Sequence, residues 1–339
     1  MNLVTTKTPR IITRLIWSSC LLLVVLLGAV FLGVSAGSSG GGMSSVLQVI
    51  LGKSDPDSML HAIIWQIRLP RVLLATLVGA TLSLGGLVFQ ALLRNLLAEP
   101  YILGISGGSA IGAISGILLG LSRFPGVSLT AFIGSIATLV LILVMTSGQS
   151  VLKKESLLLS GVMVNAFCSS VIMFLISVTQ DAKLHNIIFW LMGDLSTADI
   201  GQVGILAGML LPCFILVFWH SHAMNLLLMG KEMAQSTGIN IKAVTITLLV
   251  TSSFMVSATV SYCGLIGFVG LVMPHLLRLI FGPDHRILVP ACILGGGSYL
   301  VICDLLARTL PEQGEMPAGV ITALIGAPLF IILLKRSGR

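Results

Sequence analysis

The sequence predicts an all-α, polytopic membrane protein with ten transmembrane helices. Of its 339 residues, 56% are hydrophobic and 9% are charged, whereas a soluble domain carries about 25% charged residues. The mean hydropathy is +1.06. Long stretches contain no Asp, Glu, Lys or Arg, and about 20 apolar residues suffice to cross a hydrocarbon core of about 30 Å. This composition excludes a soluble enzyme, a disordered chain and a disulfide-stapled secreted module.

The apolar stretches are expected to be helices, because peptide groups in lipid must be hydrogen-bonded internally. A transmembrane barrel would instead show short segments of alternating hydrophobicity, and the sequence has none. The ten predicted spans are Leu15–Ala36, Val72–Leu92, Ile102–Leu121, Val127–Met145, Leu157–Val178, Val203–Trp219, Ala243–Tyr262, Leu265–Phe281, Ile287–Leu306 and Ala318–Leu334. They are expected to form a single transmembrane domain over residues 1–339.

The first span presents a choice between a signal peptide and a retained helix. Lys7, Arg10 and Arg14 precede an apolar run that ends in Val34–Ala36, which loosely resembles a cleavage site. The apolar core of a signal peptide has about 7–15 residues, and this run is longer. The length therefore favours a retained first helix.

The seventh and eighth spans come from one uninterrupted apolar stretch. As a single helix, residues 243–281 would be about 59 Å long at about 1.5 Å per residue, nearly twice the thickness of the hydrocarbon core. The stretch must therefore fold back, and Cys263–Gly264 is the predicted turn. The glycine-rich region after Leu265 also leaves room for a broken helix.

The distribution of basic residues predicts the orientation in the membrane. An even number of spans places both termini on one side, and Lys and Arg are enriched on the cytoplasmic side. With the N-terminus inside, the 13 inner residues are Lys7, Arg10, Arg14, Arg94, Lys153, Lys154, Lys231, Lys242, Arg278, Arg286, Lys335, Arg336 and Arg339. The 6 outer residues are Lys53, Arg68, Arg71, Arg123, Lys183 and Arg308. Both termini are therefore expected in the cytoplasm, and no concentrated basic patch indicates nucleic-acid binding.

Three of the outer arginines lie against predicted span ends. Arg68 and Arg71 lie where the second span begins, and Arg308 lies just beyond the ninth. Long basic side chains at such positions can extend to lipid phosphates. Alternatively, guanidinium groups can recognise an anionic partner outside the membrane by bidentate pairing. The spacing leaves both interpretations open.

A few ionisable residues lie close to the predicted spans. Asp304 lies near the outer end of the ninth span, Glu315 just before the tenth, and His275 towards the inner end of the eighth. Ionisable groups within spans are costly and indicate function by default. However, Asp304 is four residues before Arg308, which is the spacing of a helical ion pair. The pattern favours structural pairing, and an ion-driven transporter with Asp304 and Glu315 as coupling carboxylates is the alternative function.

The inner loop between the sixth and seventh spans, residues 229–239, is the most polar intracellular segment. Gly230 and Gly238 bracket one or two helical turns, and Gly238 suits a left-handed C-terminal cap. Such a short helix can be an interfacial connector or a segment that docks into a partner protein. The residues alone do not decide between the two.

The sequence carries no motif for nucleotide binding or covalent chemistry. It lacks a GxxxxGK[ST] phosphate loop, an HExxH motif and a CxxC pair. The run Gly104–Gly108 follows no strand, so close helix packing explains it better than dinucleotide binding. His220 and His222 have no third metal ligand nearby, which favours polar capping over metal binding. Active transport would therefore need an ion gradient or a separate energy-providing subunit.

Several long motifs, in order, resemble the permease subunits of type II ABC importers, the family of cobalamin, ferric-siderophore and haem permeases. The motifs are Arg68–Arg71 (RLPR), Asn95–Pro100 (NLLAEP), Leu103–Gly108 (LGISGG), Gly264–Leu271 (GLIGFVGL), Pro274–His275 with Arg278, Asp284–Arg286 (DHR), Glu315–Ala323 (EMPAGVITA) and Gly326–Pro328 (GAP). The resemblance covers the chain from about Ile64 onward. Leu96 departs from the family pattern, which usually has proline at this position.

The resemblance implies roles for three groups of residues. The docking arginines, which would receive two glutamates of a binding protein, are Arg68, Arg71 and Arg308. The coupling residues, which would contact an ATPase subunit, are Gly230, Lys231, Glu232, Ala234 and Gly238. The two halves of a cytoplasmic gate are Asn95 with Leu97 and Glu155 with Ser156.

The resemblance also implies an assembly and a mechanism. Two copies of this chain would surround a pathway lined by the fifth and tenth spans, with two ATP-binding subunits below and one substrate-binding protein above. ATP and magnesium would bind the ATPase subunits, so this chain is expected to have no catalytic residue, metal or cofactor of its own. Transport would follow alternating access across the bacterial inner membrane. Ferric siderophore is the first choice of cargo, with haem, cobalamin and an oxyanion such as molybdate left open.

Overall fold

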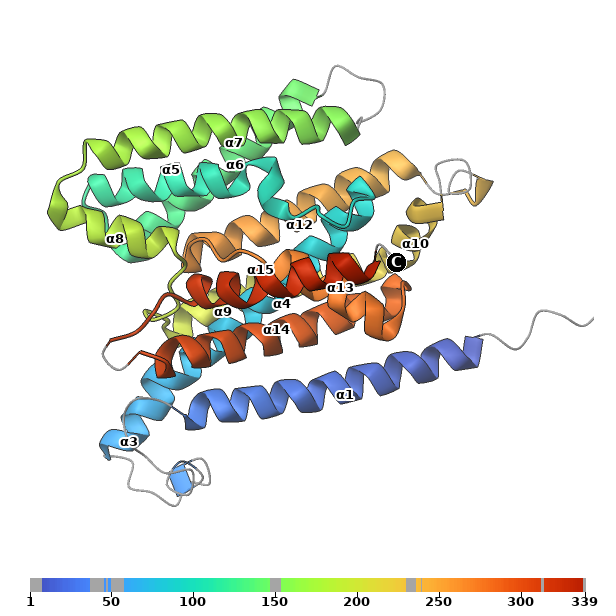
Figure 1. Cartoon of the computed structure of the whole chain (residues 1–339), viewed down its shortest axis with the longest axis horizontal. Coiled ribbons are helices and arrows are strands. Elements are labelled where there is room, and N and C mark those ends of the chain that lie inside the picture. The colour runs from blue at the N-terminus through green and yellow to red at the C-terminus, as the bar shows by residue number, and fades with distance from the viewer. Residues whose placement is uncertain are drawn as a thin grey trace, which may run out of the picture.

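The computed structural model describes residues 8–36, 46, 48–49, 58–146, 154–229, 236–238, 240–311 and 314–337. The elements of this part of the chain are all helical, and most run side by side along one axis (Figure 1). They are α1 (Thr8–Ser35), α3 (Met59–Ala62), η1 (Ile63–Arg68), α4 (Leu69–Leu93), η2 (Pro100–Leu103), α5 (Ile105–Leu118), η3 (Arg123–Val127), α6 (Ser128–Thr146), α7 (Lys154–Ser177), α8 (Asp181–Leu191), α9 (Ile200–Trp219), α10 (Ser221–Met229), α12 (Ile241–Cys263), α13 (Val269–Phe281), α14 (His285–Thr309) and α15 (Ala318–Ser337).

Each of the ten predicted spans corresponds to one of these helices. Within the described residues, 7 helices are long and apolar enough to cross a membrane. The helices α5, α13 and α15 provide the shorter apolar segments, so the number of crossings stays a prediction. The prediction of an all-α polytopic membrane protein is confirmed.

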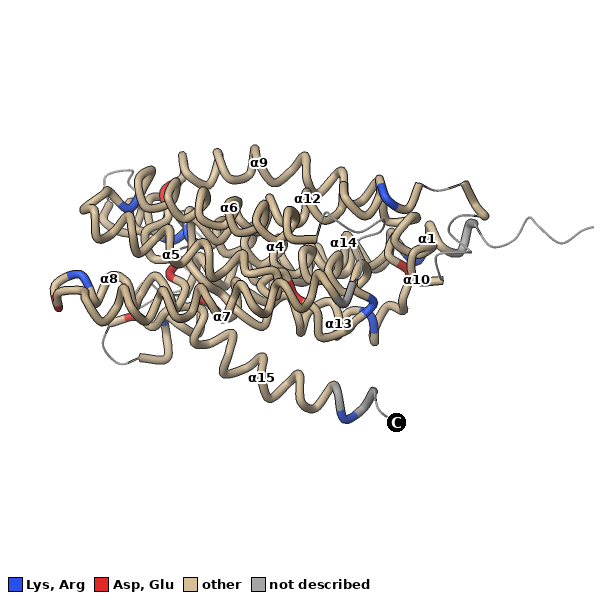
Figure 2. The backbone as a smooth tube through the Cα atoms, turned by 90° about the horizontal axis from the view of Figure 1, so that it is seen from above, with Lys and Arg blue, Asp and Glu red and all other residues tan. Residues whose placement is uncertain are grey.

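The first helix begins and the last helix ends at the same end of the bundle (Figure 1). We call this the N/C end and the opposite one the distal end. Basic and acidic residues gather at these two ends and are sparse between them (Figure 2). Charges at the two ends are expected of helices that cross a membrane, because the hydrocarbon core excludes charge. Termini at the same end are expected when the number of crossings is even.

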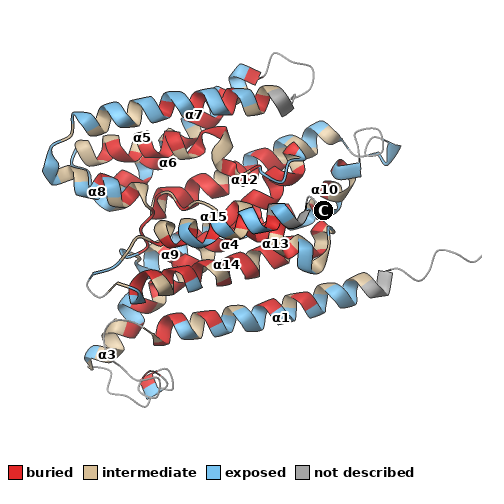
Figure 3. Ribbon diagram, viewed as in Figure 1, coloured by how far each residue is buried: buried red, intermediate tan, exposed pale blue. Residues whose placement is uncertain are grey.

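The helix α4 forms the centre of the bundle. It packs against α14, α12 and α13, and almost all of its residues are buried (Figure 3). Glycines allow the close approach, because a Cβ on Gly79 would overlap the carbonyl of Gly296 and one on Gly86 would overlap that of Gly270. Small residues at helix contacts are typical of membrane bundles, in which close packing rather than water exclusion joins the helices.

The break between α12 and α13 lies where the sequence predicted a turn. The helix α12 ends at Cys263, and Gly264 follows with φ +73°. The eighth span was predicted to begin at Leu265, which is wrong by four residues because α13 begins only at Val269. The intervening residues are not helical, and the chain here bonds to other parts of the bundle: the Cys263 carbonyl accepts from the Asp194 N–H at 2.8 Å, and the Ile266 carbonyl accepts from the Tyr101 hydroxyl at 3.1 Å.

The outer faces of the peripheral helices are apolar. Trp17 of α1, Phe167 of α7 and Trp219 of α9 are 73%, 67% and 82% exposed. Exposed apolar surface on this scale is unfavourable in water. It is the surface expected for helices that face lipid or another membrane-embedded chain.

Candidate functional site

The three arginines predicted to dock a partner lie inside the distal end of the bundle. Arg68, Arg71 and Arg308 are only 4%, 4% and 6% exposed. They come from η1, the first turn of α4 and the last turn of α14, which the structure brings together. Together with Asp304 and Glu315 they form what we call the arginine cluster.

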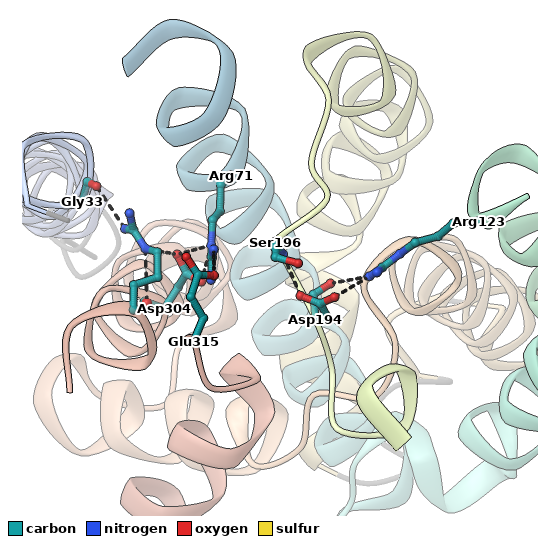
Figure 4. Close-up of polar contacts among 8 residues, drawn as sticks. Gly33, Arg71, Arg123, Asp194, Ser196, Asp304 and Glu315 are labelled. Atoms are coloured by element: carbon teal, nitrogen blue, oxygen red, sulfur yellow. Dashed lines mark hydrogen bonds and ion pairs between the residues drawn. The ribbon is translucent and has the colours of Figure 1, made fainter. Parts of the chain in front are cut away.

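Two carboxylates neutralise part of the arginine cluster (Figure 4). Arg71 donates from Nε to Asp304 at 2.9 Å and from Nη1 to Glu315 at 2.5 Å. Arg308 lies 3.1 Å from the other oxygen of Asp304, so the predicted helical ion pair is confirmed. The Asp304 side chain is fully buried, whereas that of Glu315 is 43% exposed. With three arginines and two carboxylates, the cluster has a formal charge of +1.

The remaining guanidinium donors cap the end of α1. Arg68 donates to the carbonyls of Val34 and Ser35, both at 3.0 Å, and Arg308 donates to the carbonyl of Gly33 at 3.0 Å. The last carbonyls of a helix have no partner within the helix. The cluster therefore connects α1, α4 and α14 with the segment that leads into α15.

These contacts bear on the alternative of an ion-driven transporter. A coupling carboxylate must bind and release its ion, but Asp304 and Glu315 are both held by Arg71. An ion pair in which both members are buried is costly to break. The structure therefore does not favour this alternative.

A second ion pair at the distal end joins η3 to the loop between α8 and α9. Arg123 donates to Asp194 at 2.8 Å, and Asp194 also accepts the backbone N–H of Ser196 at 2.8 Å (Figure 4). Burial alone would raise the pKa of Asp194, but the hydrogen bonds from Ser196 and the charge of Arg123 hold it below its usual range. This pair joins residues 71 positions apart, so no local spacing in the sequence indicated it.

At the N/C end, the predicted gate residues Asn95 and Leu97 form a tight turn after α4. Arg94 adopts a left-handed conformation with φ 49° and ends the helix. The Asn95 side chain then accepts the N–H of Leu97 at 2.9 Å, as asparagine commonly does in turns. Leu96 and Leu97 are 37% and 48% exposed. The turn is therefore shaped by asparagine, with leucine at position 96.

The other predicted gate residues, Glu155 and Ser156, lie in the first turn of α7. Ser156 is partly buried, and the side chain of Glu155 lies outside the described part of the structure. The helix α7 packs against α5 and η2, and η2 follows the Asn95 turn. The structure thus brings α7 next to η2, the element that follows the Asn95 turn.

Four of the predicted coupling residues, Gly230, Lys231, Glu232 and Ala234, lie outside the described residues. Gly238 is described, and its φ of +79° confirms the predicted left-handed conformation. It is exposed at the N/C end.

The helix α10, which leads into this segment, is connected to the bundle by contacts that the sequence did not indicate. Arg94 donates to the carbonyl of Leu227, which joins α10 to the end of α4. Asn225 donates to Asp284 at 2.8 Å and accepts the N–H of His285 at 2.9 Å, which joins α10 to the start of α14. Burial alone would raise the pKa of Asp284, but hydrogen bonds from Arg286 and Asn225 lower it to about 2.

No part of the described chain resembles a metal site. Among these residues, no group of three or more His, Cys, Asp or Glu side chains could hold a metal ion. His220 caps the end of α9, and its ring contacts the carbonyl of Leu216 at 2.8 Å. This contact agrees with the capping role predicted for that histidine.

The fold defines the chain as a helical, multi-pass membrane protein, and comparison with known proteins identifies its family. Residues 22–336 match the FecCD transport family. The chain is 38% identical to the hemin transport system permease protein HmuU of Yersinia pestis over 335 residues, which covers 96% of this chain and 97% of HmuU. It is 40% identical to the vitamin B12 import system permease protein BtuC of Salmonella arizonae over 277 residues, which covers 81% and 84%.

A solved structure shares the same fold. An inward-facing conformation of a metal-chelate type ABC transporter superposes with a TM-score of 0.83 at 31% identity, and the match covers 94% of this chain and 98% of that one. The chain belongs to the FecCD transport family and is a permease of a metal-chelate, haem or cobalamin type II ABC importer. The resemblance read from the motifs is confirmed, and the chain is a multi-pass protein of the bacterial inner membrane.

Proposed function

We propose that this chain carries a metal chelate inward across the membrane by alternating access, driven by ATP hydrolysis on separate subunits. The observation that carries the proposal is the match over 96% of the chain to a hemin permease at 38% identity. The sequence has no phosphate-binding loop of its own, so ATP and magnesium would bind a partner ATPase. This chain would supply helices, docking surfaces and gates, with no covalent chemistry.

The pathway would lie between two copies of the chain, along α7 and α15. Both helices lie on the same side of the bundle in the view of Figure 2 and present exposed apolar side chains, among them Met163 at 60% and Leu324 at 65%. Such surfaces fit a partner chain in the membrane as well as they fit lipid. A wide, weakly binding pathway suits a bulky chelate whose affinity is supplied by a binding protein.

The distal end would receive the substrate-binding protein. Its arginine cluster has a formal charge of +1 and would attract acidic side chains on the lobes of that protein. Glu315 is the exposed member of the cluster and already occupies Arg71, so an incoming carboxylate would have to displace Glu315. Docking at Arg71 is therefore an exchange of carboxylates rather than the filling of a vacant site.

The N/C end would face the cytoplasm and the ATPase subunits. The positive-inside rule supports this orientation, because the inner set of 13 basic residues outnumbers the outer set of 6. Residues 230–238 would contact the ATPase. The contacts of α10 with Arg94 and Asp284 would carry its movement to the ends of α4 and α14, next to the gate turn at Asn95.

Uptake into proteoliposomes tests the proposal. The chain is reconstituted with its ATPase and binding protein, and accumulation of a labelled chelate is measured with and without ATP. We expect uptake only with ATP and no loss of uptake when an ionophore collapses the ion gradients. Uptake without the ATPase, or abolished by the ionophore in the presence of ATP, would contradict an ATP-driven permease.

A further inference from the structure

A cavity of about 480 Å³ lies at the distal end, between the end of α5, η3 and α8. Its wall includes the basic side chains of Arg123, Lys183 and His185 together with the rings of Phe189 and Trp190. Cavities of about 300–1,000 Å³ are typical of small-molecule sites. None of the docking, coupling or gate residues lines this cavity, so the proposed function does not account for it.

The cavity carries a positive charge that its own residues do not neutralise. Its lining includes one carboxylate, Asp194, which already accepts hydrogen bonds from Arg123 and Ser196 (Figure 4). Lys183 donates to the carbonyl of Leu118 at 2.7 Å and forms no ion pair among the described residues. An ammonium group has three N–H donors, and the carbonyl takes one of them. Arg123 and Lys183 minus Asp194 leave a formal charge of +1.

Aromatic rings form the apolar part of the same wall. The rings of His185 and Phe189 lie 4.3 Å apart between centroids, whereas Trp190 is only 5% exposed and presents little of its ring to the cavity. Aromatic faces bind flat apolar groups, and guanidinium and ammonium groups bind carboxylates. The combination selects a ligand that has both a flat apolar body and a carboxylate.

We propose that this cavity binds an anionic metal chelate, with a carboxylate of the chelate at Lys183 and Arg123 and its apolar body against Phe189. The inference rests on the proposed function and narrows its cargo. Haem has this chemistry, because its flat ring carries propionate side chains.

The position of the cavity suits a ligand that is about to enter the pathway. A shallow, open apolar depression lies between α8 and α15 and is lined by Leu191, Met192, Gly319 and Ala323, among others. Trp190 of the cavity directly precedes Leu191 of the depression. The end of α8 therefore borders both the charged cavity and the helix α15 that is proposed to line the pathway.

The test compares hemin with hemin dimethyl ester, which has the same ring but no free carboxylate. The full-length chain is placed in phosphatidylcholine nanodiscs, and both probes are titrated by absorbance. We expect hemin to bind at least fivefold more tightly than its ester. Because a partly exposed ion pair changes affinity by up to about fivefold, Lys183→Gln should remove most of this preference, while Lys335→Gln at the N/C end should leave it unchanged.

Arg123 needs a further control, because it also pairs with Asp194. Arg123→Gln is therefore compared with the double variant Arg123→Gln/Asp194→Asn, which removes both charges of the pair. The preference for hemin should fall in Arg123→Gln and recover in part in the double variant. Equal binding of hemin and its ester by the unmodified chain, or an unchanged preference in Lys183→Gln, would overturn the proposal.

A lipid phosphate could also occupy a cationic cavity at the end of a membrane bundle. The titration is therefore repeated in nanodiscs that contain phosphatidylglycerol. If this lipid abolishes the preference for hemin, the cavity is a headgroup site and the chelate assignment is wrong. ATP-driven uptake by the complete complex is measured separately. If uptake persists although the cavity shows no preference for hemin, only this inference is refuted. If no chelate is taken up, the proposed function is refuted.

Discussion

Replacing Asp304 by asparagine is expected to destabilise the folded chain by about 3 kcal/mol. The Asp304 side chain is fully buried, and its two ion-pair partners, Arg71 and Arg308, are 5% and 6% exposed. Removing one member of a buried ion pair costs about 3–5 kcal/mol, because the other charge stays buried and unpaired. We place the loss at the lower limit because the asparagine oxygen still accepts a hydrogen bond and Glu315 still pairs with Arg71.

The measurement is the free energy of unfolding of the purified chain in mixed micelles, followed as the fraction of denaturing detergent rises. Asp181→Asn, the same change at an exposed position in the first turn of α8, is the control and should cost no more than about 0.5 kcal/mol. Adding Arg308→Met to Asp304→Asn returns the cluster to a charge of +1 and should recover part of the loss. A cost for Asp304→Asn equal to that of the control would refute the reasoning.

Four other predictions follow from the two ends of the bundle. Because the docking arginines are buried and hold the distal end together, docking is tested with Glu315→Gln, which frees Arg71 of its exposed carboxylate and should strengthen pull-down of the binding protein while the ATPases stay attached; unchanged affinity would remove the docking assignment. Glu232→Arg or Gly238→Trp should preserve ATP hydrolysis but reduce uptake in proteoliposomes at least tenfold, and normal uptake would count against the coupling role. Tags at both termini should react only with reagents that reach the cytoplasm; a tag that reacts from the periplasm contradicts the orientation. The pKa of Asp284 is lowered to about 2 from 3.8, so its carboxylate stabilises the fold above about pH 4 and loses this effect as the pH falls to about 2. The free energy of unfolding of Asp284→Asn should therefore be lower by about 1–2 kcal/mol at pH 7 and by little at pH 2. A loss that is independent of pH would contradict this prediction.

The sequence predicted the helices well because lipid leaves few alternatives for an apolar segment. Every charge-free stretch of sufficient length became a helix, and the break at Cys263–Gly264 was placed correctly. The start of α13 was missed because Phe268 adopts a left-handed conformation with φ 67°, which no local pattern indicates for a phenylalanine. The non-helical residues before it are stabilised by hydrogen bonds from distant parts of the chain.

The site was predictable only where its contacts are local. The pair Asp304–Arg308 follows from the spacing of four residues on one helix. The pair Arg71–Asp304 joins residues 233 positions apart, so the sequence showed the charges but not which of them would meet. For the same reason the three docking arginines were expected to face lipid phosphates or a partner, whereas the fold buries them, Arg68 and Arg308 against the end of α1 and Arg71 against Asp304.

The contacts at the two ends also determine which helices can move in the proposed cycle. The helices α4 and α14 are joined at the distal end by Arg71 and Asp304 and along their length by the close contact of Gly79 with Gly296. At the N/C end both are connected to α10, through Arg94 and Asp284. A pair held at both ends and at its centre moves as one body. We therefore expect the change in access to involve α7 and α15, which have exposed faces and are proposed to line the pathway, and docking at the arginine cluster would reach α15 first through Glu315.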